Sequence, residues 1–236
     1  MANHLIAPQP HDLANSDLFR DVPETALSDA VRCAVVRHLP KGTTVFAQDQ
    51  RADRARALLA GRVRIAQGGS EGEQLLVRFV GPGEIFGAIG LFTGRIYPAQ
   101  ATTVLDSIEI SWSESALLTL IELYPQIAIN LVKITGKRLR DAEERLRELA
   151  TQPVERRIAH VLLRLAGQAG QSTDEGTAID FPLGRKDIAD MCGASLHTVS
   201  RTLTAWEKAG WIETSRQRVT VRNRPELRKR SEDICQ

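Results

Sequence analysis

A stretch of the sequence without helix-breaking residues, from Pro125 to about Ala150, constrains the fold of this chain most strongly. Pro125 suits the first turn of a helix, and Gly136 is the only glycine in the stretch. Apolar and small residues recur at steps of three and four, which marks one face of a helix. These residues are Ile127, Leu131, Thr135, Leu139, Ala142, Leu146 and Leu149. The pattern predicts a single helix roughly 35–40 Å long.

A helix of this length carries a longer apolar stripe than one small domain can cover. We therefore expect the stripe to form a parallel seam with a second copy of the chain, which makes the protein a homodimer. The alternative is that the stripe packs entirely within its own chain. Oppositely charged pairs at i,i+4 spacing, Arg140–Glu144 and Glu143–Arg147, flank the stripe and favour the helix.

The sequence before this helix has the texture of a small β domain. Residues 1–16 have no periodic pattern and are expected to form a flexible tail. Between residues 17 and 112, short apolar runs with a period near two are separated by glycines, which predicts strands in a β-barrel or β-roll. Ser113 suits the N-cap of a helix that follows them. We therefore predict a β-roll domain over residues 17–118 and the long helix within residues 119–150.

The sequence after Pro153 predicts a third domain, over residues 151–236. Residues 154–170 have the spacing of an amphipathic helix, and a polar stretch that we expect to be a loop follows. Two shorter helical patterns then meet at residues 193–195, where Ser195 suits the cap of the second helix. A short turn that contains glycine is typical of helix-turn-helix units. Two short strands predict a wing after it, so the whole chain is expected to be an α+β protein.

The second of these short helices has one apolar and one polar face. Four apolar side chains at steps of three or four are predicted to close the core of the domain: Leu196, Val199, Leu203 and Trp206. The polar side chains that remain near the start of the helix are His197, Thr198, Ser200, Arg201 and Thr204. A polar helix face of this kind suits docking in the major groove of DNA. The alternative is an ordinary helix face in contact with water.

The charge of the chain favours a local nucleic-acid site. The formal net charge is only +2, so the protein is not basic overall. Residues 184–224 nevertheless hold eight basic and four acidic residues, a local charge of +4 over 41 residues. A basic patch beside an exposed helix is the footprint expected of a DNA-binding domain.

Several classes of protein lack support in the sequence. Three cysteines, Cys33, Cys192 and Cys235, are scattered without a CxxC motif, which argues against a disulfide framework, a zinc site and an iron–sulfur cluster. No phosphate-binding glycine loop, nucleophile elbow or zinc-protease motif is present, so we do not expect an enzyme. Without a recognisable leader or an apolar run of about 20 residues, we expect a soluble cytoplasmic protein.

Three segments together resemble the Crp/Fnr superfamily of bacterial transcription regulators. They are "GPGEIFGAIGLF", "PVERRIAHVLLRL" and "RKDIADMCGASLHTVSRTLTAWEKAGWI". The resemblance covers nearly the whole chain. It implies a β-roll sensor domain like that of cyclic-nucleotide-binding proteins, a dimerisation helix and a winged helix-turn-helix that binds double-stranded DNA. It also implies RNA polymerase as a partner.

In this family the recognition helix commonly reads Glu-Thr-Ile/Val-Ser/Gly-Arg, where this chain has "HTVSR" over residues 197–201. The resemblance implies that Arg201 binds a guanine and that Ser200 selects a TTG-type half-site in a TTG-N8-CAA palindrome. His197 replaces the usual glutamate, so we expect a shifted or relaxed preference at that base pair. Contacts to the DNA backbone are expected from Arg185, Lys186, Ser195, Thr198, Arg216 and Arg218.

The resemblance also bears on the effector pocket. Members that bind cAMP carry a glutamate in Gly-Glu-x-Gly-Leu-Phe and a later Arg-Ser pair, whereas this chain has Ala88 at the first position and Tyr97-Pro98 at the second. A buried phosphate without an arginine is costly, so cAMP binding is not expected. The pocket implied by the resemblance comprises Gly87, Ala88, Gly90, Leu91, Tyr97 and Pro98.

The "YPA" motif over residues 97–99 and the helix-turn-helix region look most like the Dnr/NnrR branch, which responds to nitric oxide and controls denitrification genes. In that branch a haem is the proposed detector, which requires an axial ligand such as histidine. The candidate ligands in the first half of the chain are His4, His11 and His38, of which we favour His38 and His11.

Other readings of the sequence stay open. The regulator could respond to another ligand, to the redox state of the Cys33 thiol, or to no signal. A second class is a ligand-binding adaptor that uses the wing for protein contacts.

Overall fold

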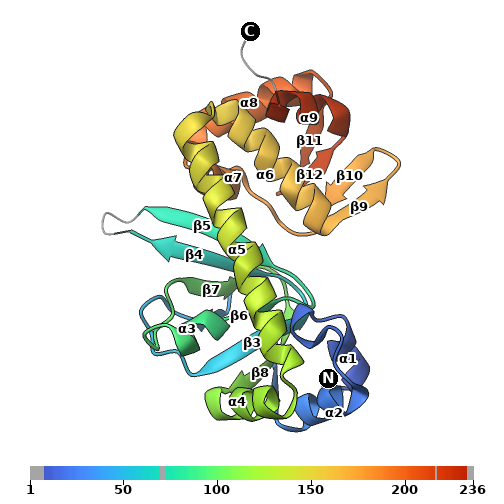
Figure 1. Cartoon of the computed structure of the whole chain (residues 1–236). Helices are drawn as coiled ribbons and strands as arrows, with labels where there is room; N and C mark the ends of the chain where they lie inside the picture. Colours follow the sequence, from blue (N-terminus) through green and yellow to red (C-terminus); the bar gives the residue numbers. More distant parts are fainter. Residues whose placement is uncertain (1–7, 70–72, 216, 233–236) are drawn as a thin grey trace. The chain divides into compact units, whose positions relative to one another are not determined.

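The computed structural model describes residues 8–69, 73–215 and 217–232. It confirms the predicted α+β class, with a β domain, a long helix and a helix-turn-helix domain along the chain (Figure 1). The chain divides into two compact units. The β-roll unit comprises the described parts of residues 1–68 and 79–140, and the winged-helix unit comprises those of residues 69–78 and 141–236.

The strands before the long helix form two four-stranded sheets. The first has the antiparallel order β1-β8-β3-β6, with β1 Val35–Leu39, β8 Ser107–Ser113, β3 Arg54–Ala60 and β6 Ile85–Phe86. The second has the order β2-β7-β4-β5, with β2 Thr44–Phe46, β7 Gln100–Thr103, β4 Val63–Gly68 and β5 Gln74–Val80. Strands β3 and β8 are buried along most of their length, so their apolar and small side chains form the centre of the β-roll unit.

The core of the β-roll unit surrounds Trp112 at the end of β8. The ring centroids of Trp112 and Phe19 lie 5.3 Å apart, and Phe19 ends the 3-10 turn η1 (Asp17–Phe19). The indole Nε1 of Trp112 donates a hydrogen bond of 2.8 Å to the carbonyl oxygen of Ala30 in helix α2 (Glu24–Arg32). The sequence pattern did not predict α2, whose fully buried residues are the small Ala26 and Ala30, with Leu27 and Val31 partly buried against the same core.

The prediction of a flexible tail over residues 1–16 was wrong for its described part. Pro10–Ala14 form helix α1, and Leu13 is fully buried in the core of the β-roll unit. Ser16 then caps η1, because its hydroxyl accepts a hydrogen bond from the amide of Leu18. A helix of five residues is too short to show a period in the sequence.

Two further helices flank the last strands of the roll. Residues 88–92, predicted within a strand, form helix α3 (Ala88–Phe92) because Gly87, at φ +74°, turns the chain out of β6. The cap at Ser113 is confirmed: its hydroxyl accepts a 3.2 Å hydrogen bond from the amide of Ala116 and begins helix α4 (Glu114–Leu123).

The long helix is confirmed as α5, which spans Gln126–Thr151. Its first turns pack within the chain: Ile127 is fully buried, Leu131 packs against the same core, and Asn130 donates to the carbonyl oxygens of Leu18 and Arg20. Ile127 therefore cannot belong to a seam with a second copy, and that part of the prediction was wrong. The first step of the predicted stripe leads from Ile127 to Leu131. Both residues lie on the side of α5 that packs against the core of its own chain.

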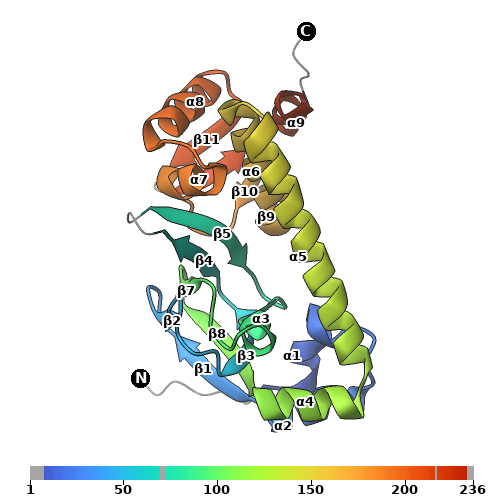
Figure 2. The same ribbon diagram turned by 60° about the vertical axis from the view of Figure 1, so that its left-hand side comes forward.

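The winged-helix unit contains four helices and two hairpins among the described residues after α5. The helices are α6 Val154–Ala169, α7 Arg185–Cys192, α8 Leu196–Lys208 and α9 Arg224–Glu232. The hairpins pair β9 Gly170–Thr173 with β10 Gly176–Ile179, and β11 Ile212–Ser215 with β12 Arg218–Val221, in the sheet order β11-β12-β10-β9. Helices α7, α8 and α9 each pack against α6 (Figure 2).

The predicted wing and both short helices are confirmed. The polar stretch after α6 was predicted as a loop and is instead the hairpin β9–β10. All four residues of β9 are exposed, so no apolar alternation marked this strand in the sequence. Helix α9 was not predicted, because Leu227 is its only buried apolar residue.

By length and composition, no single helix among the described residues could cross a membrane. One bent pair, Glu114–Leu123 with Gln126–Thr151, meets the same criteria when its two helices are combined.

The burial of Leu13 yields a prediction about stability. We expect Leu13→Ala to lower the free energy of unfolding by about 2–5 kcal/mol, because it leaves a cavity between α1 and the core of the roll. Denaturant unfolding followed by tryptophan fluorescence measures the change, with the exposed His11→Ala as the matched control. Equal stability of the two variants would mean that α1 is not docked.

Candidate DNA-binding face and effector pocket

The turn between α7 and α8 is fixed by backbone geometry and by a cap. Gly193 has a left-handed φ of +57° at the C-terminal end of α7, which only glycine adopts readily. The hydroxyl of Ser195 then accepts a 3.1 Å hydrogen bond from the amide of Thr198 and begins α8. The direction of α8 is therefore set at its first residue.

The apolar face of α8 differs from the prediction at one position. Val199 and Leu203 are fully buried and Trp206 nearly so, as predicted, whereas the side chain of Leu196 is 48% exposed. Side chains of a helix point toward its N-terminal end, so the first residue of α8 points away from the core. Thr202 is buried in the face that Leu196 was expected to help form.

The polar face of α8 presents an unpaired cation. His197 and Arg201 are exposed, and Thr198 and Ser200 are half-buried beside them. Within the described part of the chain, the side chain of Arg201 has no hydrogen bond or ion pair. Its guanidinium is therefore available to a ligand with paired acceptors.

The basic residues that flank α8 fall into two groups. The guanidinium of Arg185 bonds Thr204 and Glu207 of α8, at 3.4 and 3.3 Å, and Lys186 pairs with Asp190 within α7. Both therefore support the helix-turn-helix as well as lying near its surface. Arg218 at the start of β12 is exposed. Arg216, predicted beside it, lies outside the described residues.

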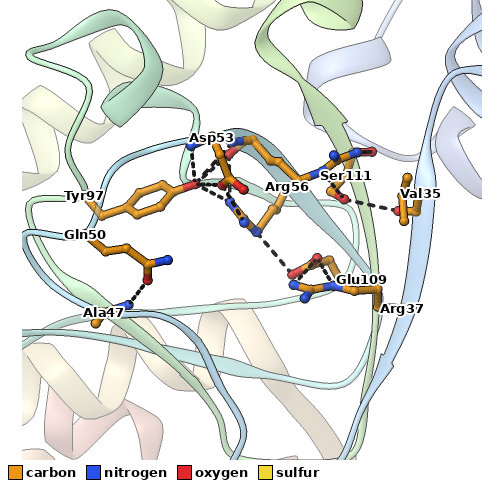
Figure 3. A network of polar contacts seen from close by, with 10 residues as sticks. Val35, Arg37, Ala47, Gln50, Asp53, Arg56, Tyr97, Glu109 and Ser111 are labelled. Atoms are coloured by element: carbon orange, nitrogen blue, oxygen red, sulfur yellow. Dashed lines mark hydrogen bonds and ion pairs between the residues drawn. The ribbon is translucent and has the colours of Figure 1, made fainter.

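The predicted effector pocket surrounds Tyr97, which is fully buried (Figure 3). Its hydroxyl accepts hydrogen bonds from the amides of Asp53 and Arg54 at 3.2 and 3.3 Å, lies 2.9 Å from Asp53 Oδ1, and contacts Arg56 Nη1. The phenol thus occupies the centre of a polar network. The side chain fills the site where a ligand would need space.

A buried arginine packs beneath this ring. The guanidinium of Arg56 lies 5.3 Å from the ring centroid of Phe46 and 5.4 Å from that of Tyr97, and the two rings stack at 3.9 Å. Only 4% of Arg56 is exposed. Burial in such a place requires compensation of the charge.

Two carboxylates supply that compensation. Arg56 lies 3.0 Å from Asp53 and 3.6 Å from the fully buried Glu109, and Arg37 reaches Glu109 at 2.8 Å from the other side. The network therefore contains two cations and two anions. Burial alone would raise the pKa of Asp53, but the hydrogen bonds from Arg56 and Tyr97 hold that pKa below its ordinary value.

The predicted pocket glycines lie close to Tyr97: a Cβ on Gly87 or Gly90 would lie 3.3 or 3.2 Å from a carbon of its ring. Ala88 and Leu91 are buried, and a Cβ on Gly90 would lie 2.8 Å from the carbonyl oxygen of Ile96. Pro98 is exposed instead of facing the pocket. Sequence reasoning missed Phe46, Arg56 and Glu109, because β2, β3 and β8 are distant in sequence and no motif links them.

The candidate haem ligands lie at the surface. His38 on β1 is exposed, and the side chain of His11 is 79% exposed beside Asp12. His4 lies outside the described residues. Among the described residues, no three histidines, cysteines or carboxylates gather as a metal site. Exposed imidazoles lack the apolar surroundings that a haem requires, so the described candidates do not fit that group.

Cys33 is exposed at the end of α2, and partial burial of its thiol raises the pKa above its ordinary value. A raised pKa disfavours the reactive thiolate, so Cys33 lacks the character of a redox-sensing thiol.

Comparison with known proteins agrees with this architecture. The cyclic nucleotide-binding domain model matches residues 36–124, and the Crp-like helix-turn-helix domain model matches residues 156–230. The chain is 31% identical over 191 residues to the nitrogen fixation regulation protein FixK of Azorhizobium caulinodans. The matched region covers 80% of this chain and 76% of FixK. It is 28% identical over 219 residues to the CRP-like cAMP-activated global transcriptional regulator of Mycobacterium tuberculosis, covering 93% and 98% of the two chains.

Among solved structures, that of FixK2 from Bradyrhizobium japonicum superposes with a TM-score of 0.75 at 25% identity, covering 86% of this chain and 99% of the other. These similarities span both the β-roll and the helix-turn-helix, and the relatives are regulators rather than enzymes. The chain therefore belongs to the Crp/Fnr family of DNA-binding transcription regulators.

Proposed function

We propose that this protein is a cytoplasmic homodimeric regulator whose two α8 helices read a palindrome of the TTG-N8-CAA type. The observation that carries the proposal is the exposed guanidinium of Arg201, on a capped helix and without a partner among the described residues. Arginine binds the O6 and N7 atoms of guanine with two parallel hydrogen bonds. Two such helices fit successive major grooves roughly 34 Å apart.

The neighbouring residues complete the proposed reading of DNA. His197 and Ser200 share the N-terminal face of α8 with Arg201 and would contact adjacent bases. The proposed contacts to phosphate come from Arg185, Lys186, Ser195, Thr198, Arg216 and Arg218. Of these, Arg218 is the best supported, because it is exposed on the wing.

The exposed apolar residues of α5 support the proposed homodimer. Val132, Leu139 and Leu146 are 73%, 60% and 68% exposed, and they repeat every seven residues. Thr135, Ala142 and Leu149 are exposed at the positions between them. This is the a and d pattern of a two-stranded parallel coiled coil, with small residues at two d positions. The seam proposed here begins at Val132. It leaves out Ile127 and Leu131, which the sequence had led us to expect in it.

We further propose that the β-roll does not take up a cyclic nucleotide. The ring of Tyr97 fills the predicted pocket, and the charges around Arg56 are balanced without a ligand phosphate. The "YPA" motif supports the Dnr/NnrR branch, with nitric oxide as the signal and denitrification genes as targets. A haem detector has no support from His38 or His11. RNA polymerase is the proposed partner at the promoter.

Replacement of Arg201 tests the DNA-reading face. We expect Arg201→Ala to weaken binding to the palindrome by about 1–3 kcal/mol and to relax the preference at the guanine, because a bidentate contact is lost. Fluorescence anisotropy with the palindrome and with guanine-substituted sites measures both effects.

Arg218→Ala is the matched control for that experiment. Loss of a phosphate contact should weaken binding to all sequences alike and reduce the salt slope by about one. Unchanged specific binding by Arg201→Ala would show that α8 does not read the site.

Charge in the middle of the seam tests the homodimer. We expect Leu139→Glu to give a monomer, because like charges would face each other at an a position, and to lose tight binding to the palindrome. Light scattering measures the mass, and Lys133→Glu, on the outer face of the coiled coil, is the control. A dimeric Leu139→Glu would exclude this seam.

The closed pocket gives a prediction about effectors. We expect cAMP and cGMP at millimolar concentration to leave the affinity for the palindrome unchanged, and nitric oxide added without oxygen to change it. Anisotropy titrations measure both effects on the same protein. A shift with either nucleotide would show that Tyr97 leaves the pocket, and indifference to nitric oxide would remove the support for the Dnr/NnrR branch.

A further inference from the structure

One arginine links the end of the long helix to the turn of the helix-turn-helix. Arg157, on the first turn of α6, donates from Nη1 to the carbonyl oxygens of Leu149 and Gln152 at 3.3 and 3.1 Å. Its Nη2 donates to the carbonyl oxygen of Gly193 at 3.4 Å. A single guanidinium therefore joins α5 to the turn before α8.

The same two elements also touch through an apolar contact. The Cδ2 atom of Leu149 lies 2.9 Å from the position that a Cβ on Gly193 would take. Glycine is therefore required here for two reasons: the backbone is left-handed, and a side chain would clash with Leu149. Gly193 lies two residues before Ser195, the cap of α8, so Leu149 lies against the turn from which that helix begins.

A buried ion pair holds the joint between α5 and α6. Glu148 is only 3% exposed, and its carboxylate accepts a 2.6 Å hydrogen bond from Arg164 Nη1. His160 Nδ1 lies 3.8 Å from the same oxygen. Because two side chains of α6 hold one carboxylate of α5, the last turn of α5 is a fixed part of the winged-helix unit.

We propose that Arg157 is a positioning residue for DNA recognition, which transmits the position of the last turn of α5 to α8. The proposal rests on the proposed role of α8 as the recognition helix. Leu149 ends the proposed seam with the second copy and also packs against Gly193. Leu149 therefore connects the proposed seam to the turn that directs α8. Arg157 bonds the carbonyl oxygens of both Leu149 and Gly193, the two residues in this contact.

Substitution by lysine tests this role, because lysine keeps the positive charge. Its ammonium cannot span the three carbonyl oxygens that the planar guanidinium joins. We expect Arg157→Lys to bind the palindrome about five- to tenfold more weakly, as expected for one or two lost hydrogen bonds. Affinity for a scrambled duplex and the salt slope of binding should stay at the wild-type values, because no phosphate contact is lost.

Amide hydrogen exchange gives an independent readout. We expect Arg157→Lys to speed exchange in residues 193–197, with the rest of the winged-helix unit and the dimer mass unchanged. Arg156→Lys is the matched control, since it makes the same replacement one residue earlier. Arg157→Gln, which also removes the charge, should lose specific affinity to a similar extent and keep the salt slope.

Three outcomes would overturn the proposal. Wild-type specific affinity in Arg157→Lys would show that the link does not position α8. An equal loss on both duplexes with a shallower salt slope would identify Arg157 as a phosphate contact. Faster exchange throughout the unit would indicate a purely structural role. If the wild type does not prefer the palindrome, the proposed function fails, whereas a normal wild type with a normal Arg157→Lys refutes only this inference.

Discussion

The ion pair between Glu148 and Arg164 is the interaction on which the DNA-binding half of the molecule depends. Glu148 is buried, so removal of Arg164 would leave its carboxylate charge without its main partner, at a cost of about 3–5 kcal/mol. Burial raises the pKa of the nearby Cys192 thiol to about 12. The pair therefore holds the end of α5 against α6, and α7 and α8 pack on α6 in turn.

Two arginines show how the same side chain serves opposite purposes in the two units. Arg56 is buried, stacked on two rings and paired with Asp53 and Glu109, so its charge is already balanced without an anionic ligand. Arg201 is exposed and bonds no described residue, so its full capacity for hydrogen bonds remains. The charge of Arg56 is thus used within the β-roll unit, whereas that of Arg201 is left for the proposed contact with DNA.

The sequence predicted the elements whose patterns are local or repeat over many residues. It missed those that depend on contacts between residues far apart in the sequence. The long helix α5 and the glycine turn before α8 follow from local patterns, and both are confirmed, whereas the stripe of α5 is wrong at Ile127. Helix α1 is too short to show a period, and its burial depends on the roll. At the candidate sites, Tyr97 was identified from its place in a motif. Its partner Arg56 lies 41 residues away, on a strand that reads as apolar.

The exposed residues of α5 show why its end is well suited to carry a signal. An ideal straight helix drifts by about 20° per heptad against a seven-residue repeat, so a seam that keeps this repeat makes two helices supercoil. Val132, Leu139 and Leu146 keep the repeat, as do Thr135, Ala142 and Leu149. In the proposed coiled coil Leu149 would lie in the last layer, and it also lies against Gly193 of its own chain. In the proposed dimer, a change in the supercoil along α5 would alter the position of that layer, which lies against the turn that directs α8.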